Sequence, residues 1–317
     1  MHKRIILVIL AACVLLSMVA CADKDKTDTA PSSDVIVHTP SNLIGFAVQD
    51  TGDMKVYEAM HSFICTAADI GMNAKLYKFA SQQELDSAVD DAITDNCDAV
   101  LFYCENTAPE SGMEKLEKHG IRTVSLIQKN EKASCSIIAD DGDSQMLAIL
   151  AEKAVDGSVL IYSSEAVDIS ALSSTLGEKW ASTPIKSFVR TEYAYNEAKD
   201  SLYSYLVNNT SVKAIYALGE QNARPATLAA QKMDSGIVVI GCELTDINVK
   251  LYDEGLYALA VTPYYDMAAR AVYAMQKLAD GKTCEDEVCS VHLVTADKLE
   301  KYNSIRHNTA EWFGIQG

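Results

Sequence analysis

The chain has 317 residues, of which 49% are hydrophobic and 22% are charged, and its formal net charge is -17. This is the composition of a globular protein that is long enough for two domains. So acidic a surface repels phosphate backbones, and no helix-turn-helix or basic arm stands out, so we exclude DNA and RNA as partners.

The N-terminus has the layout of a secretion signal. Two basic residues precede an apolar run that is too short for a comfortable membrane span, and small residues follow. The stretch from Met18 to Cys21 resembles a bacterial lipobox, in which the cysteine is lipidated and becomes the new N-terminus. An uncleaved anchor helix is the alternative. We expect residues 1–20 to be a lipoprotein signal peptide, and 21–42 to be the lipidated Cys21 with a flexible polar tether. The domain then works outside the cytoplasm, anchored to the cell membrane.

From Leu43 onward, apolar runs typical of buried strands alternate with residues at helical spacing. Strands are expected at 43–48, 74–79, 98–103, 122–127, 134–139, 158–162, 185–190, 213–218, 237–242, 256–261 and 290–294, with helical patterns between most of them. This alternation predicts an α/β fold, with parallel sheets covered by helices on both faces. Because one sheet rarely takes so many strands, two sheets in two lobes are the simpler interpretation.

Seven cysteines follow Cys21, and an odd number cannot pair completely within one chain. Most lie in apolar patterns, where cysteine is usually a small buried hydrophobe. Cys284 and Cys289 form the one plausible local disulfide. A zinc site is less favoured, because zinc ligand pairs usually lie closer together and a second pair is missing. We expect no metal and no cofactor.

Polar residues just after the predicted strands are the candidate site, because ligands of doubly wound sheets bind beyond the carboxyl ends of the strands. They are Gln49, Asp50, Asp53, Tyr103, Glu105, Gln128, Lys129, Asp140, Asp141, Glu165, Glu220, Glu243, Thr262 and Tyr264. Carboxylates and amides hydrogen-bond hydroxyl groups, and aromatic rings stack on the apolar face of a sugar. Helix capping competes as an explanation for the Asp residues, whereas Glu is a poor N-cap. The set suits a neutral polyhydroxylated or a cationic solute.

Catalytic signatures are missing from the sequence. It contains no GxGxxG, GxxxxGK[ST], GxSxG or HExxH, and its histidines are scattered. Paired carboxylates such as Asp140 and Asp141 could do acid-base work, but capping or ligand binding is the commoner role at a strand-to-helix junction. We therefore expect a protein that is not an enzyme and has no catalytic residues.

Segments spread from Leu43 to Tyr302 resemble, in the right order, the type I periplasmic binding proteins, especially the ribose- and galactose-type sugar-binding branch. They read IGFAVQD, HGIRTVSL, VKAIYALGEQNA, GIVVIGCE, EGLYALAVTPYYDMAARAVYAMQKLADGK and HLVTADKLEKYN. The resemblance implies two Rossmann-like lobes, joined by three crossovers and closing on a solute by a hinge motion. The crossovers are then expected near 134–138, 260–264 and 291–294. The implied divisions are an N-terminal lobe of 43–134 plus 263–291, a C-terminal lobe of 135–262 plus 292–303, and a tail of 304–317.

The residues of the family's sugar site carry over unevenly. The Asn-Pro-Phe-Phe of the first loop aligns near 53–56, so its stacking phenylalanines are absent. An Asp-Arg pair becomes Gln128-Lys129, an Asp-Asn pair becomes Asp140-Asp141, an Asn-Asp pair becomes Gly219-Glu220, an Asp becomes Glu243, and a late Gln falls at Thr262. Tyr103, Tyr264 and Tyr265 are candidates for stacking instead. A sugar, a sugar-like polyol, a modified sugar, or a cationic or zwitterionic solute is compatible with these changes.

Four functions remain open at this point. The first is a lipid-anchored solute receptor, expected to be a monomer, that delivers its solute to an ABC importer. The same closure could instead signal to a membrane histidine kinase or chemoreceptor without transport. An enzyme, or a protein-interaction module that has lost its ligand, are further alternatives. A regulator of the related repressor class is excluded by the leader and by the missing DNA-binding head.

Overall fold

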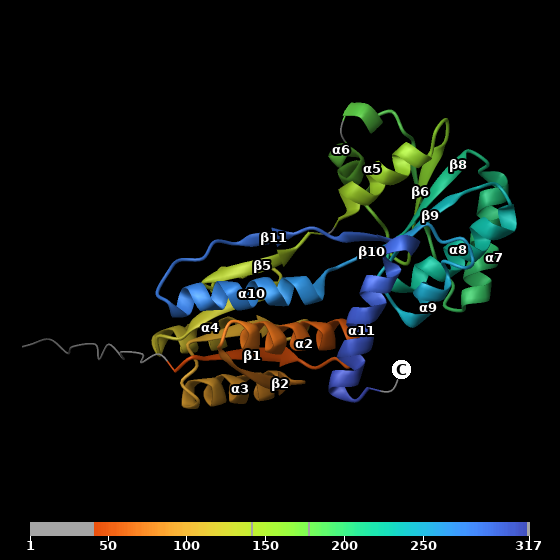
Figure 1. The fold of residues 1–317 in the computed structure, drawn as a ribbon. Coiled ribbons are helices and arrows are strands. Elements are labelled where there is room, and N and C mark those ends of the chain that lie inside the picture. Colours follow the sequence, from red (N-terminus) through yellow and green to blue (C-terminus); the bar gives the residue numbers. More distant parts are fainter. Residues whose placement is uncertain (1–40, 141, 177, 316–317) are drawn as a thin grey trace, which may run out of the picture. The chain divides into compact units, whose positions relative to one another are not determined.

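The computed structural model describes residues 41–140, 142–176 and 178–315. The expected signal peptide and Cys21 lie outside these residues, as does Asp141. Within the described ranges, no helix is both long and apolar enough to span a membrane. The chain forms two six-stranded sheets flanked by helices, which confirms the expected α/β class with two lobes (Figure 1).

The first sheet is parallel throughout, in the order β11-β5-β4-β3-β1-β2. Its strands are β1 (Leu43–Gln49), β2 (Asn73–Phe79), β3 (Ala99–Tyr103), β4 (Arg122–Ile127), β5 (Cys135–Ala139) and β11 (Glu287–Cys289). Helices α2 (Met54–Asp69) and α10 (Tyr264–Ala279) lie side by side on one face (Figure 1), and α3 (Gln82–Thr94) and α4 (Glu110–Lys118) pack on the other. Both faces are therefore covered, which explains why β1 and β3 are almost continuously apolar.

The second sheet has the order β12-β10-β9-β8-β6-β7, and only its pair β10–β12 is antiparallel. The strands are β6 (Ser158–Ser163), β7 (Ile185–Val189), β8 (Val212–Ala217), β9 (Val238–Cys242), β10 (Ala258–Val261) and β12 (His292–Thr295). One face packs against α5 (Asp143–Lys153) and α6 (Ile169–Thr175), the other against α7 (Tyr195–Asn208) and α8 (Ala223–Met233). Shorter elements are η1 (Glu178–Trp180), η2 (Glu220–Asn222), α9 (Asp246–Lys250) and η3 (Ala296–Lys298).

The chain passes between the sheets three times. The passages follow Ala139 at the end of β5, Val261 at the end of β10 and Cys289 at the end of β11. The first differs from the expected place, because Cys135–Ala139 pairs with β4 and β11 and so belongs to the first sheet instead of opening the second lobe. Its side chains explain the difference, since those of Cys135 and Ile137 are buried in the first core.

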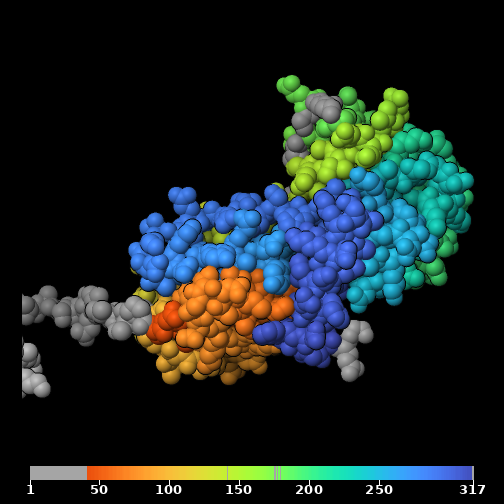
Figure 2. Space-filling view, in the orientation of Figure 1, coloured from red at the N-terminus to blue at the C-terminus, as the bar shows by residue number. Residues whose placement is uncertain are grey.

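The segment expected to be a C-terminal tail is mostly helical. Helix α11 (Leu299–Phe313) ends at Gly314, whose positive φ of 65° lets its N–H bond to Ala310 O. Tyr302 packs on the second core, whereas Phe313 packs on the first. In the space-filling view, the dark blue surface of α11 lies directly against the orange surface of α2 (Figure 2). The helix thus contacts both lobes.

Candidate functional site

The carboxyl ends of β1 and β3 are joined by a single side chain. Gln49, the buried last residue of β1, accepts hydrogen bonds at Oε1 from the backbone N–H groups of Glu105 at 2.8 Å and Asn106 at 3.0 Å. The two strands are neighbours, with Val48 paired to Tyr103, so the loop after β3 comes within reach. Gln49 therefore holds the loop that presents Glu105.

Two buried tyrosines form an aromatic wall beside this loop. Tyr103 ends β3 and Tyr264 begins α10, and their ring centroids lie 6.2 Å apart at an angle of 77°. The Tyr103 hydroxyl donates a hydrogen bond to the Glu105 carboxylate. Burial raises the pKa of both phenols, so both stay protonated and keep a hydrogen to donate.

Lys55, in the first turn of α2, places an ammonium group in front of the aromatic wall. Its Nζ lies 3.6 Å from Glu105 Oε1, 4.0 Å from Asp53 Oδ2 and 5.8 Å from the centroid of the Tyr264 ring. Burial alone would lower the pKa of Lys55, but Tyr264 and the surrounding carboxylates outweigh it, and the pKa is raised. Sequence reasoning missed this residue, because it considered only the loop and stopped at Asp53.

The second sheet contributes Glu243 and Thr262, at the exits of β9 and β10. Thr262 Oγ1 donates a hydrogen bond to Glu243 Oε1 at 3.2 Å. Glu243 has a φ of 62°, in the left-handed region where a residue other than glycine is strained, and such strain gathers at functional sites. Burial raises the pKa of Glu243, against the opposing effects of Thr262 and Lys55. An electrostatic interaction thus couples Lys55 of the first lobe to Glu243 of the second.

Glu58, one turn after Lys55 on α2, adds another carboxylate. Burial raises its pKa to about 7, Arg306 of α11 opposes the shift, and Glu243 reinforces it. A cavity of about 20 Å³ lies beside it, lined by residues of α10 and α11. We call the following set the inner cluster: Lys55, Glu58, Tyr103, Glu105, Glu243, Thr262 and Tyr264.

The inner cluster can bind a polar solute by hydrogen bonding and by contact with aromatic rings. Its carboxylates accept hydrogen bonds, its tyrosines and lysine donate them, and the rings offer flat apolar surface. Among residues 41–140, 142–176 and 178–315, no group of three or more His, Cys, Asp or Glu side chains could hold a metal ion.

Comparison with known protein families decides the relationship. The family model described as periplasmic binding protein domain matches residues 44–283, which is most of the chain. The chain belongs to the periplasmic binding protein family. This confirms the resemblance found in the sequence. Among curated proteins, none matches the sequence significantly.

Solved structures show the same fold in other periplasmic binding proteins. An arabinose binding protein from Geobacillus stearothermophilus matches with a TM-score of 0.68 and 11% identity, over 82% of this chain and 98% of that one. A solute binding protein of an ABC transporter from Bacillus halodurans, with bound myo-inositol, matches with a TM-score of 0.57 and 15% identity, over 83% and 97%. One from Actinobacillus succinogenes, with bound D-allose, matches with a TM-score of 0.59 and 14% identity, over 82% and 99%.

Three predicted site residues of the first lobe are engaged mainly outside the inner cluster. Asp50 Oδ2 lies 3.1 Å from Lys78 Nζ of β2. Lys129 Nζ lies 3.1 Å from Glu131 and 3.5 Å from Asp286. Asp53 lies at the N-cap of α2 but makes no capping hydrogen bond with its side chain, so the capping explanation does not hold there. Its Oδ2 accepts a hydrogen bond from Thr51 Oγ1 at 3.1 Å and faces Lys55 only at 4.0 Å.

The remaining predicted residues are spread along both sheet edges. Gln128 lines a cavity of about 160 Å³ at the exits of β3 and β4 of this periplasmic binding protein. Asp140 Oδ1 accepts a hydrogen bond from Gly142 N–H at 3.4 Å. Glu165 lines a cavity of about 600 Å³ at the exits of β6 and β8. Glu220 lies in η2, exposed, and raises the pKa of Glu243 only as a lesser effect behind burial.

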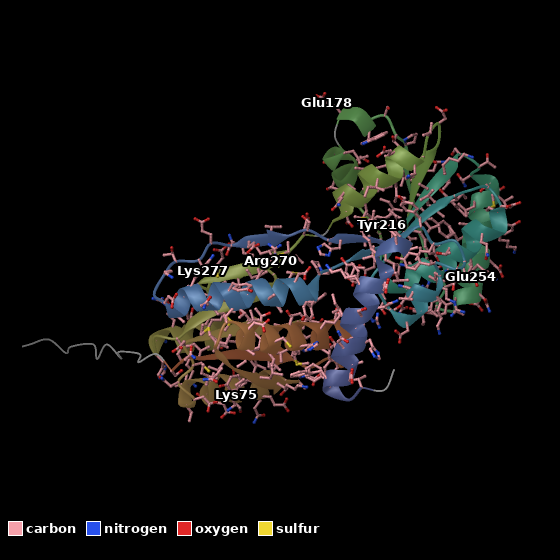
Figure 3. The ribbon with its side chains drawn as sticks, in the orientation of Figure 1. Lys75, Glu178, Tyr216, Glu254, Arg270 and Lys277 are labelled. Atoms are coloured by element: carbon pink, nitrogen blue, oxygen red, sulfur yellow. The ribbon has the colours of Figure 1, made fainter. Side chains whose placement is uncertain are left out.

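The cavity lined by Glu165 is supported by a buried tyrosine that the sequence analysis did not single out. Tyr216 of β8, labelled in Figure 3, donates a hydrogen bond of 2.8 Å to Asp143 Oδ1, and Asp143 lines the cavity. A volume of about 600 Å³ lies in the range of small-molecule sites. Tyr216 looks like an ordinary core residue in the sequence, because it lies inside an apolar strand. Only the helix start at Asp143 could have drawn attention to the pair.

Cys284 and Cys289 do not form the local disulfide that the sequence left open. The seven cysteines of the described residues are all free. Strand β11 extends from Glu287 to Cys289, so extended chain separates the two thiols, and Cys289 is buried in the first core. Extended backbone carries two cysteines apart by about 3.3 Å per residue, too far for a disulfide over this spacing.

Proposed function

We propose that this periplasmic binding protein captures a sugar or a sugar-like polyol outside the cytoplasm and delivers it to an ABC importer. The observation that carries the proposal is the inner cluster, in which a wall of two buried tyrosines stands beside carboxylates from the exits of both sheets. Hydroxyl groups of a sugar would bond the carboxylates, and its apolar face would lie on a tyrosine ring. The cluster binds and does not turn over its solute.

The relatives support this choice of solute class. The three similar structures are an arabinose binding protein and two ABC transporter binding proteins with bound myo-inositol and D-allose. All three solutes are neutral and polyhydroxylated. Lys55 favours the same class, because its ammonium already balances part of the acidic charge of the inner cluster.

Solute binding is coupled to lobe closure in this proposal. Glu105 and Tyr103 belong to the first lobe, and Glu243 and Thr262 lie at the exits of the second sheet. A solute that bonds both sets has higher affinity for the closed state, and so shifts the population towards it. The closed form is then the one that an importer recognises.

A melting-temperature screen of the full chain tests the proposal. The panel contains myo-inositol, D-allose, arabinose and ribose, with amino acids and polyamines as the comparison set. A solute at 100 times its dissociation constant stabilises the protein by about 2.7 kcal/mol. Stabilisation by a neutral polyol supports the proposal. Stabilisation by amines alone would mean that the ligand is a cation and not a sugar or polyol. If no compound stabilises the protein, solute capture is excluded as its function.

The N-terminal anchor is part of the same proposal. Lipidation of Cys21 after removal of residues 1–20 would keep the domain at the membrane next to its importer. Metabolic labelling with an alkyne fatty acid should mark the wild-type chain and not a Cys21→Ala variant. Equal labelling of both would refute lipidation at this cysteine.

A further inference from the structure

Two cysteines distant in sequence meet at the edge of the first sheet. Cys135 is the first residue of β5 and is buried, and Cys284 is half-buried in the segment between α10 and β11. Strand β11 pairs with β5 in parallel, with Glu287 opposite Ile137. The segment before β11 also follows β5, since Ser136 N–H donates a hydrogen bond of 2.8 Å to Asp286 Oδ1.

The two thiols meet at the first core, where Cys135 is one of the buried residues and Cys284 packs against the cluster. Counted back along the pairing of β11 with β5, Cys284 falls within one residue of Cys135. Because Cys284 precedes the strand, the alternation of strand side chains does not fix its direction. Burial raises the pKa of Cys135, and the neighbouring Cys284 thiol is the next largest cause, so the two side chains interact.

Contacts from α10 hold this region in place. Arg270 forms an ion pair with Glu287, the first residue of β11, and Lys277 lies in the last turn of α10 before the segment that carries Cys284 (Figure 3). Cys284 also lines a cavity of about 680 Å³. A dissolved oxidant can therefore reach Cys284, while Cys135 is shielded.

We propose that Cys135 and Cys284 form a disulfide once the domain is outside the cytoplasm. The inference rests on the extracytoplasmic location in the proposed function, where disulfides persist. The Cys284 thiolate attacks an external disulfide, such as that of an oxidised thiol–disulfide carrier, and forms a mixed disulfide. This attack breaks the carrier's disulfide and releases one of its sulfurs as a thiolate. The Cys135 thiol then loses its proton and attacks the Cys284 sulfur, which breaks the mixed disulfide and releases the carrier's other sulfur. One S–S bond forms in the protein, and the carrier leaves as two thiols with the two electrons and two protons.

The bond would link the amino-terminal ends of two neighbouring strands whose carboxyl ends lead into hinge passages. Strand β5 leads to the first passage between the sheets and β11 to the third. The link closes a loop of about 150 residues, and long loops give the largest restriction of the unfolded chain. The oxidised protein should therefore melt several degrees above the reduced protein.

Peptide mapping of the full chain tests the pairing. The protein is treated with oxidised glutathione, or with dithiothreitol as control, then alkylated, digested and analysed by mass spectrometry. The expected product joins the peptides of Cys135 and Cys284 and carries an alkylated Cys289. Alkylation of both cysteines after oxidation, or a bond from Cys284 to Cys289, would overturn the proposal.

Melting temperatures with matched variants give a second test. Cys284→Ser should abolish the difference between oxidised and reduced protein, whereas Cys289→Ser should retain it. A difference that survives Cys284→Ser would contradict the proposal, and the wild-type comparison holds even if a variant folds poorly. Solute binding is measured separately on Cys284→Ser, so a missing disulfide is distinguished from a failure of solute capture.

Discussion

Two ion pairs at the carboxyl edge of the first sheet resemble each other closely but lie in different surroundings. Lys55 and Glu105 are 3.6 Å apart with side-chain exposures of 36% and 31%, and Lys78 and Asp50 are 3.1 Å apart with 39% and 28%. Each lysine also faces aromatic rings, those of Tyr264 in the first pair and of Tyr57 and Phe313 in the second. Exposure and local chemistry therefore do not separate them.

The difference lies in what the second sheet adds. Glu243, at the exit of β9, acts on Lys55 and Glu58, so the inner pair belongs to a cluster drawn from both lobes. The outer pair joins Lys78 of β2 to Asp50, which follows β1. The aromatic rings near Lys78 include Phe313 of α11, which contacts Tyr57 and so attaches that helix to the first lobe. In this molecule, the charged residues beyond the strand ends form a common site where residues of both sheets interact with each other.

The largest expected effect separates an inner tyrosine from an outer one. Tyr264→Ala removes a buried ring from the inner cluster and should lower the free energy of unfolding by about 3 kcal/mol. Tyr193→Ala is the matched control, because Tyr193 is 96% exposed beyond the exit of β7, and it should change stability by about 0.5 kcal/mol or less. Urea unfolding measures both. A loss of stability in Tyr264→Ala as small as that in Tyr193→Ala would mean that the aromatic wall has no packing role.

The next effect uses the ionisation of Glu58. Its pKa is raised from 4.5 to about 7, so its contribution to stability is fully present below pH 4.5 and is lost as the pH rises through 7. Glu58→Gln should resemble the wild type near pH 4.5 and exceed it at pH 8 by on the order of 3 kcal/mol. Glu300→Gln, at an exposed position of α11, makes the same chemical change outside the inner cluster and is the control.

Substitution of Arg306 tests which groups set the raised pKa of Glu58. Its guanidinium lowers the pKa of Glu58 against burial, so Arg306→Gln should move the loss of stability to higher pH. Unfolding measured from pH 5 to pH 9 would reveal the displacement. A transition that stays at the same pH would mean that Arg306 contributes only through Leu244 and Asp246, to which it is hydrogen-bonded.

The sequence is sufficient to predict most strands, because each buried strand is an apolar run between polar loops. Strand β3, Ala99–Tyr103, is buried at every residue, and its apolar pattern predicts it to within one residue. The lobe limit near 134 could not be predicted as well. Strand β5 pairs with β11, about 150 residues later, and such pairing is not encoded in local periodicity.

The sequence predicts which edge of the sheets carries the site, but not which residues gather there. The rule that site residues follow strands identifies Glu105 and Glu243. It also identifies Asp50 and Lys129, whose partners Lys78 and Asp286 come from elsewhere in the fold. Helix α11 was missed for a related reason. Thr309 is its one fully buried residue among those described, so no apolar stripe marked the helix.

Solute affinity tests whether the Lys55–Glu105 and Lys78–Asp50 pairs differ in function. Glu105→Gln keeps the size of the side chain but removes its charge, and should weaken binding of the solute found in the melting screen about tenfold, or about 1.4 kcal/mol. Asp50→Asn makes the same chemical change in the outer pair and should weaken binding less than about twofold. Calorimetric titration measures both. Similar losses would place the site over the whole edge of the first sheet.

The smallest effect is the coupling energy within each pair. Double-mutant cycles with Lys55→Met and Glu105→Gln, and with Lys78→Met and Asp50→Asn, should each give about 0.5 kcal/mol without solute, because both pairs are partly exposed. Saturating solute should change only the inner coupling, since its hydroxyl groups compete with Lys55 for the Glu105 carboxylate. If the outer coupling changes as much, solute binding acts on the whole first lobe, and the two pairs do not differ in function.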